Sequence, residues 1–215
     1  ERRVLILSNT PGHGITHSLF CGFQVVGPGE TARCHRHTQA AVRFVVEGGN
    51  AFTAVDGERL YMSRGDFIPP PSWTWHEHTN NDETPLIWLD GLDVPLSNFM
   101  QATFAEVHPA GNQEILRPDD DSVRRYGAGM LPIEEVPGHQ HSPVYKYPYD
   151  QCRATLEALR KGPIDPAHGH IMKYADPRNG GHVMPTLAAY LQLLPEEFTG
   201  EALRNTASQV FFVVE

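Results

Sequence analysis

The chain has 215 residues, enough for one large domain or for one domain and part of another. Its 26 acidic and 17 basic side chains give a net charge of −9, and without a run of Lys or Arg we expect no nucleic-acid partner. No apolar stretch approaches the roughly 20 residues that cross a membrane, and the first residues lack a secretory layout. The three cysteines form no CxxC pair, so we expect a cytoplasmic protein without disulfides or membrane contact.

Residues 4–92 contain short β-type segments separated by Gly, Pro and Asp. Examples are 42–46, 51–55 and 59–62, and the dipeptide Asp56-Gly57 stands between the last two. Asp-Gly between two such segments is a strong hairpin signal, and many short strands at close spacing indicate a sandwich or a barrel. The expected fold class is therefore all-β.

The sequence after this β-rich part changes character. Residues 106–147 are rich in Pro, Gly and Asp, which indicates a long connection. A helix is expected near 150–161, with Asp150 as its N-terminal cap and with Arg153 and Glu157 paired at i, i+4 spacing.

Two histidine signals indicate a metal site. His35 and His37 stand at i and i+2 of a β-type segment, which turns both imidazoles to one face of a strand. Gly65 and Pro71 precede His76 at spacings that mark a turn and a bend before another strand. If these strands face each other in one barrel, the three histidines can share one ion. The alternative, unrelated surface or core histidines, explains a single His but not this combined spacing.

An internal repeat with an offset of 168 residues relates the two ends of the chain. Residues 42–47 (VRFVVE) correspond to 210–215 (VFFVVE), which predicts two β domains of one type. The same offset places Leu203 and Asn205 opposite the first two histidines, and both are poor ligands for a transition metal. The expected organisation is a metal-binding barrel at 1–104, a connecting segment at 105–183 and the beginning of a second, metal-free and truncated barrel at 184–215.

The histidine segments resemble the two cupin motifs, G-x5-HxH-x3,4-E-x6-G and G-x5-PxG-x2-H-x3-N. Gly65, Pro71, His76 and Asn80 match the second motif at its full spacing, with Trp73 in place of its second glycine. The first motif departs at its glutamate, which is Ala41 here. The predicted site therefore has three histidines and no carboxylate.

With that departure, the sequence resembles the gentisate 1,2-dioxygenase family, bicupin ring-cleaving dioxygenases that include salicylate and 1-hydroxy-2-naphthoate dioxygenases. The resemblance rests on the strings at 35–38, 43–48, 71–78, 88–93, 147–149, 180–186 and 192–195. It implies a cupin (double-stranded β-helix or jelly-roll) barrel, the start of a second cupin and one or two linker helices. It also implies Fe(II) at the histidines, O2 and a small aromatic acid as substrates, gentisate cleaved to maleylpyruvate, and a homotetramer.

Further polar residues are predicted around the metal. Arg43 stands two residues after Ala41, so the two side chains lie on the same face of a strand. We therefore expect Arg43 to point into the barrel and to pair with a substrate carboxylate. The alternative is an exposed arginine. His78 shares the face of His76 and is either an acid or base for a phenolic oxygen or a hydrogen-bonding neighbour of the ligands. Asp90 and Gln24 match family positions that line the pocket, although Asp90 could be a turn residue. The predicted catalytic residues are thus His78 and Asp90, and the predicted substrate-binding residues are Arg43, Gln24, His78 and Asp90.

Three questions stay open at this point. Imidazoles also suit zinc, which cannot perform this redox chemistry, so the choice of iron rests on the resemblance. A non-catalytic metal-binding cupin that senses a small ligand, and a cupin isomerase, are competing interpretations. The preferred aromatic acid, whether gentisate, salicylate or 1-hydroxy-2-naphthoate, depends on pocket volume, which the sequence does not determine.

Overall fold

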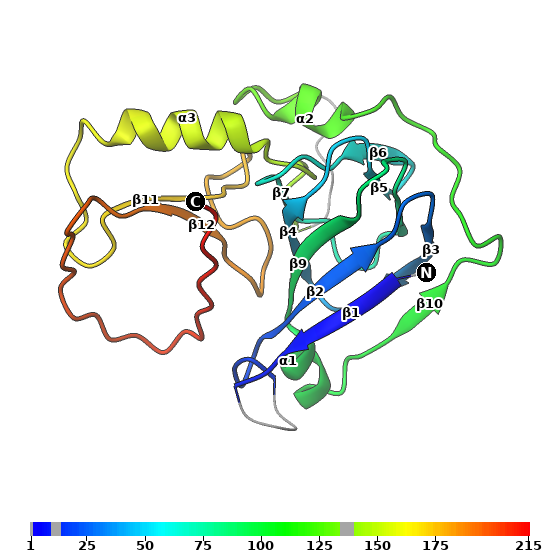
Figure 1. Ribbon diagram of the computed structural model, residues 1–215, viewed down its shortest axis with the longest axis horizontal. Helices are drawn as coiled ribbons and strands as arrows, with labels where there is room; N and C mark the ends of the chain where they lie inside the picture. The colour runs from blue at the N-terminus through cyan, green and yellow to red at the C-terminus, as the bar shows by residue number, and fades with distance from the viewer. Residues whose placement is uncertain (1, 10–13, 134–139) are drawn as a thin grey trace.

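A computed structural model describes residues 2–9, 14–133 and 140–215 (Figure 1). The first half of the chain is built from short strands, which confirms the all-β expectation. Their bounds are β1 (Arg2–Leu7), β2 (Phe20–Val26), β3 (Thr31–His37), β4 (Ala41–Glu47), β5 (Phe52–Val55), β6 (Glu58–Tyr61), β7 (Phe67–Ile68), β8 (His76–Thr79), β9 (Leu86–Leu92) and β10 (Ala105–Val107). They form two five-stranded antiparallel sheets, one in the order β1-β2-β9-β4-β7 and the other in the order β10-β3-β8-β5-β6.

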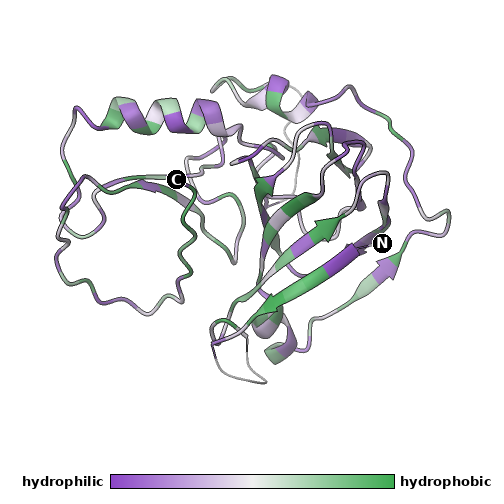
Figure 2. Cartoon of the chain, in the orientation of Figure 1, coloured by the Kyte–Doolittle hydropathy of each residue, from purple (hydrophilic) through white to green (hydrophobic). Residues whose placement is uncertain are grey.

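The inner faces of the two sheets enclose the core of this barrel. Along β4 the side chains of Ala41, Arg43 and Val45 are buried and alternate with less buried neighbours, as a strand with one inward face requires. In Figure 2 the strands of the barrel carry both hydrophobic and hydrophilic residues. The buried apolar residues of the core are Val26, Ala32, Val45, Ala51, Val55, Leu60, Met62, Ile68, Leu86, Trp88 and Tyr145.

The predicted hairpin is confirmed between β5 and β6, where Val55 pairs with Glu58. Asp56 and Gly57 have φ values of 46° and 78°, the left-handed conformations that a tight two-residue turn needs. The backbone N–H of Gly57 donates to the side-chain Oε1 of Gln113 at 2.7 Å. The connecting segment is thereby attached to the turn.

In the described part of the chain, three helices lie outside the sheets: α1 (Val94–Phe99), α2 (Asp121–Tyr126) and α3 (Tyr149–Leu159). The helix expected near 150–161 is confirmed as α3, and Arg153 forms the expected ion pair with Glu157. The expectation that Asp150 caps this helix is wrong, because the cap position is Pro148 and no side chain makes a capping bond. Asp150 lies in the first turn instead, where its charge favours the positive end of the helix dipole.

The last part of the chain packs on the outside of the barrel. Because Ala41 and Arg43 point inward, Val42 and Phe44 face outward, and they contact a second apolar cluster. The buried members of that cluster are Ala40, Phe67, Tyr174, Val183, Met184 and Leu187. In Figure 1 α3 and the pair β11 (His170–Lys173) and β12 (Tyr190–Leu193) lie beside the barrel.

Residues 194–215 form no strand, although 210–215 were expected to repeat β4. A strand exists where neighbouring backbone offers a ladder of hydrogen bonds, and in the described structure this segment has no such neighbour. The ring of Phe212 instead approaches Phe44 at 5.5 Å and Phe23 at 6.1 Å between centroids. The domain boundaries at 104 and 184 stay predictions.

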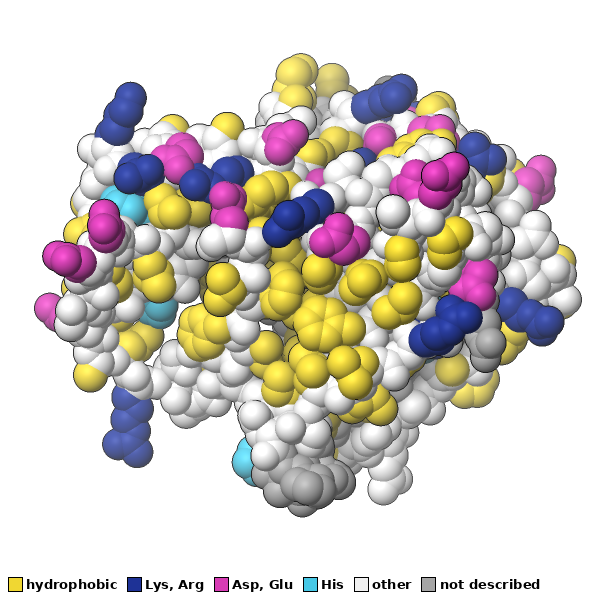
Figure 3. Space-filling view, viewed as in Figure 1, with side chains coloured by type: hydrophobic (Ala, Val, Ile, Leu, Met, Phe, Trp, Pro, Cys, Tyr) yellow, Lys and Arg dark blue, Asp and Glu magenta, His cyan; other side chains and the backbone are white. Residues whose placement is uncertain are grey.

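Strand β1 is an edge strand with exposed apolar side chains. Val4, Leu5 and Ile6 are 44%, 63% and 61% exposed. Figure 3 shows hydrophobic side chains gathered across the middle of the face shown there. Among the described residues, no helix combines the length and the apolar character that a bilayer crossing requires.

Candidate metal centre

The structure brings the three predicted ligands together at the inner face of one sheet. His35 and His37 lie on β3, and His76 begins the neighbouring strand β8. Their ring centroids are 4.4 Å (His35 to His76), 4.9 Å (His37 to His76) and 5.8 Å (His35 to His37) apart. One potential ligand atom from each lies within 4.8 Å of the others. Nitrogens bound to one ion at about 2.1 Å lie within roughly 4 Å of each other, so small ring movements complete the site.

Each of the three rings has its Nδ1 within hydrogen-bonding distance of a backbone carbonyl two residues away. For His35, His37 and His76 the acceptors are the carbonyls of Arg33 at 2.9 Å, Gln39 at 3.0 Å and Thr74 at 3.0 Å. A carbonyl can only accept, so Nδ1 carries the proton and the neutral ring keeps its lone pair on Nε2. This is the arrangement in which backbone carbonyls orient metal-binding imidazoles.

The electrostatics of the rings also suit a cation. Burial lowers the pKa of His35 and of His37 to about 4, and lowers the pKa of His76 well below its ordinary value. All three are neutral at pH 7, so an ion displaces no proton from them. Nε2 of His76 is buried without a hydrogen-bond partner. An orphaned buried nitrogen beside two further imidazoles therefore fits a metal ion.

A β-bulge in β3 lies directly before the first ligand. The pairing of β3 with β8 shifts by one residue between Ala32 and His35. The backbone of Cys34 turns to the connecting segment, with its N–H donating to Gly111 and its carbonyl accepting from His108, both at 2.9 Å. Bulges re-aim side chains next to functional sites. The Cys34 side chain is fully buried, in agreement with the packing role expected for it.

The opposite sheet contributes the predicted polar residues Gln24 on β2, Arg43 on β4 and Asp90 on β9. All three are at most 5% exposed, so the alternatives of an exposed arginine and of a turn aspartate are wrong. Nε of Arg43 lies 3.5 Å from Oδ1 of Asp90, which also accepts from Nε1 of Trp88 at 2.7 Å. Burial raises the pKa of Asp90 against the opposing effect of the Arg43 charge.

Several buried polar atoms in this part of the barrel have no hydrogen-bond partner. They include Oε1 of Gln24, Nε and Nη1 of Arg43, and both ring nitrogens of His78. His78 is fully buried, its ring centroid lies 6.2 Å from that of His76, and burial lowers its pKa well below the ordinary value. Unpaired polar groups in a buried site are costly unless a ligand or water satisfies them. The arrangement is therefore suited to a polar ligand, and both interpretations of His78 remain compatible with it.

Sequence reasoning missed Arg2, the first residue of β1. Its Nη1 lies 3.4 Å from Nε2 of His35, at the limit of a hydrogen bond. After burial, the Arg2 charge is among the causes that lower the pKa of His35. The neighbouring Arg3 instead pairs with Glu30 at 2.8 Å. No motif distinguishes these two arginines, because the approach of Arg2 depends on how β1 lies across the barrel.

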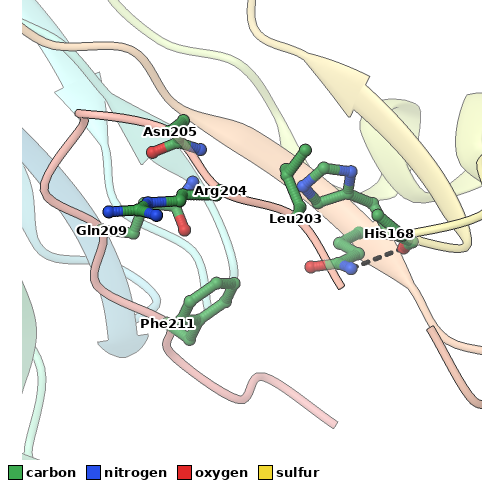
Figure 4. Close-up of a pocket in the computed structure, with 8 residues that line it drawn as sticks. His168, Leu203, Arg204, Asn205, Gln209 and Phe211 are labelled. Carbon is green, nitrogen blue, oxygen red and sulfur yellow. Dashed lines mark hydrogen bonds between the residues drawn. The ribbon is translucent and has the colours of Figure 1, made fainter. Parts of the chain in front are cut away.

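A hollow of about 350 Å³ lies in the C-terminal part of the chain (Figure 4). Its lining residues are Ala167, His168, Gln192, Leu203, Arg204, Asn205, Gln209 and Phe211. Leu203 and Asn205, the predicted counterparts of the first two histidines, both line it, and His168 is the single imidazole among the lining residues. The hollow is distinct from the three-histidine centre, and the absence of metal from a second barrel stays a prediction.

Comparison with known families identifies the class of protein. Residues 22–93 match the family described as the cupin domain. That match covers β2 to β9, the strands that carry the three histidines and the polar residues opposite them. The barrel is therefore a cupin, as the two motifs indicated.

Comparison with individual proteins narrows the class. The chain is 48% identical to "Gentisate 1,2 dioxygenase 1" of Aquipseudomonas alcaligenes, over 100% of this chain and 63% of that protein. It is 35% identical to a 1-hydroxy-2-naphthoate 1,2-dioxygenase of Nocardioides sp., over 94% of this chain and 52% of that protein. The solved salicylate 1,2-dioxygenase of Pseudaminobacter salicylatoxidans superposes with a TM-score of 0.78 at 34% identity, over 88% of this chain and 57% of that one. The chain is thus a homologue of the gentisate 1,2-dioxygenase family, and it spans about half to two thirds of the length of these relatives.

Proposed function

We propose that this chain carries the active centre of an Fe(II)-dependent dioxygenase that opens the ring of a hydroxylated aromatic acid, with gentisate as the preferred substrate. One observation carries the proposal: three clustered imidazoles lie on the sheet opposite a buried arginine whose Nη1 has no hydrogen-bond partner. The names of the relatives supply the substrate class, since they are gentisate, salicylate and 1-hydroxy-2-naphthoate dioxygenases. A related solved structure is described as a salicylate 1,2-dioxygenase adduct with gentisate.

His35, His37 and His76 would hold the iron through Nε2. Fe(II) bound in this way would supply open coordination positions and the redox chemistry that O2 activation requires. Ala41 stands where other cupins have a glutamate, so the ligand set adds no negative charge. A dianionic substrate, with a carboxylate and an adjacent phenolate, compensates the full charge of such a centre.

The chain's own residues would bind and orient that substrate. Nη1 of Arg43 has no hydrogen-bond partner, and a carboxylate can accept from it. Asp90, which accepts a hydrogen bond from Trp88, lies 3.5 Å from Nε of Arg43 and would hold the guanidinium in place. Both ring nitrogens of His78 lack partners, so the neutral ring can accept a hydrogen bond from a phenolic hydroxyl of the substrate. Gln24 offers a free Oε1 to a substrate hydroxyl.

The test is oxygen consumption by the iron-loaded protein with gentisate, salicylate and 1-hydroxy-2-naphthoate in parallel. We expect uptake to depend on the aromatic acid and to be fastest with gentisate. Faster uptake with salicylate or with 1-hydroxy-2-naphthoate would show that this acid, and not gentisate, is the preferred substrate. Protein loaded with Zn(II) is the control, because it keeps the site filled without redox chemistry. Iron binding without oxygen uptake for any of the acids would favour a non-catalytic metal-binding cupin. Assembly as a homotetramer stays a prediction.

A further inference from the structure

A strained turn precedes the third metal-binding histidine. Trp73 occupies the position of the second glycine in the cupin motif, and its φ is 62°. This left-handed conformation is open to glycine but disfavoured for a residue with a bulky side chain. Such a residue persists in this conformation only when its surroundings hold it.

The surroundings of Trp73 form a compact unit that we call the Arg36 clamp, made of Arg36, Trp73, Trp75 and Glu106. Arg36 lies on β3 between the two histidines in sequence, so strand alternation turns it to the opposite face. Its guanidinium carbon is 4.4 Å from the ring centroid of Trp73 and 4.4 Å from that of Trp75. Its Nε donates to Glu106 on β10 at 2.8 Å, and Nη2 donates to the same oxygen. The clamp therefore joins the turn to β3 and β10.

The clamp lies beside backbone groups that contact two of the three ligand residues. The backbone N–H of Trp73 donates to the carbonyl of His37 at 2.9 Å. Thr74, between the two tryptophans, has the carbonyl that accepts from Nδ1 of His76 at 3.0 Å. A change of backbone at Trp73 would move this carbonyl, and with it the tautomer and direction of the His76 ring.

We propose that Arg36 is a positioning residue for the metal centre. By holding Trp73 in the left-handed turn, it keeps the Thr74 carbonyl where it orients Nε2 of His76 toward the other two imidazoles. The inference rests on the proposed metal site. It means that Arg36, on the outer face of the barrel, helps to determine how tightly the three histidines bind a metal ion.

The test measures Co(II) binding to the metal-free protein by titration and by the visible absorption of the bound ion. Loss of groups that orient metal ligands typically weakens binding roughly 10- to 100-fold. Because Arg36 acts through the turn, we expect Arg36→Ala to weaken Co(II) binding about tenfold and to change the absorption of the bound ion. Trp73→Gly should bind Co(II) close to the parent, since glycine adopts this turn without help. The double variant should therefore recover to within about threefold of Trp73→Gly, a rescue that a general loss of stability would not give.

Arg59→Ala is the matched control. Arg59 lies on β6 over the ring of Phe52, at 5.5 Å, and pairs with Asp119 at 3.8 Å, so it has the same chemistry without contact with the turn. It should bind Co(II) like the parent. If Arg36→Ala does not fold, Glu106→Gln tests the same unit from β10, with an expected loss of about threefold.

Two results would overturn the inference. Unchanged Co(II) affinity in Arg36→Ala would show that the clamp does not influence the ligands. An equal loss in the double variant, without rescue by glycine, would show that Arg36 does not act through the turn. Failure of the parent protein to bind Co(II) or Fe(II) would instead refute the proposed function itself, so the two failures are distinguishable.

Discussion

Replacing Arg43 with methionine tests the substrate site without removing a metal ligand. Methionine retains much of the buried volume of the arginine, which is 2% exposed, but lacks its charge and its donors. Asp90 then loses its ion pair. Its pKa is already raised, first by burial, so it can take up a proton instead of remaining as an unpaired buried charge. The fold and the three histidines should therefore survive the change.

The expected loss follows from the atoms involved. Nε of Arg43 faces Asp90, whereas Nη1 has no hydrogen-bond partner in the structure and is free to donate to a carboxylate. Hydrogen bonds to charged groups contribute about 1.5–3 kcal/mol. At about 1.4 kcal/mol for each factor of ten, we expect KM for gentisate to rise roughly 10- to 150-fold.

The assay combines steady-state oxygen uptake with metal analysis of the same samples. Arg33→Met is a suitable control, because Arg33 is an exposed arginine on β3, the strand that carries two of the histidines. Arg43→Met should keep its iron and lose substrate affinity, whereas Arg33→Met should keep both. An unchanged KM in Arg43→Met would refute the assignment, and loss of iron would mean that Arg43 supports the metal site instead.

Three further changes test other parts of the account. His76→Ala should lose tightly bound iron while folding normally, since one of three ligands is removed, and near-normal iron content would contradict the site. Ala41→Glu should retain metal but lose gentisate binding, because the new carboxylate shares the inward face of Arg43 and would pair with it; normal turnover would contradict this. Glu58→Gln should raise the free energy of unfolding, because burial raises the pKa of Glu58 while Ser122 hydrogen bonds oppose the shift. A carboxyl group whose pKa is higher in the folded than in the unfolded state lowers the stability of the fold at pH values above its unfolded pKa, which is about 4.5 for Glu58. The stability gained by Glu58→Gln should therefore grow from pH 4.5 upward in denaturant titrations. A gain that is largest at low pH would contradict this prediction.

The clustering of the three histidines could be predicted because the sequence information that specifies it is periodic and local. Strand alternation at His35 and His37, and the spacing from Gly65 to His76, determine which faces the imidazoles occupy once two strands are neighbours. The same parity argument placed Arg43 inside the barrel. Asp56-Gly57 specified its hairpin because the turn requires left-handed residues.

Features that depend on contacts distant in sequence were beyond this reasoning. Nothing in the pattern indicated that Arg2 approaches His35, or that Trp73 adopts a left-handed backbone conformation. Residues 210–215 resemble β4 in sequence but form no strand. A strand also needs a neighbouring strand to pair with, which the local sequence does not reveal. The first residue of α3 was also predicted incorrectly: the helix begins at Tyr149, so Asp150 lies in its first turn and does not cap it.

The central claim is that the three-histidine centre inserts both atoms of O2 into a hydroxylated aromatic acid. Mass analysis of the product formed from gentisate under 18O2 tests it most directly. The account predicts a ring-opened product that carries label from both oxygen atoms, formed by the iron-loaded parent and not by His76→Ala or by the Zn(II)-loaded protein. A product without label, or a labelled product formed equally by His76→Ala, would contradict it.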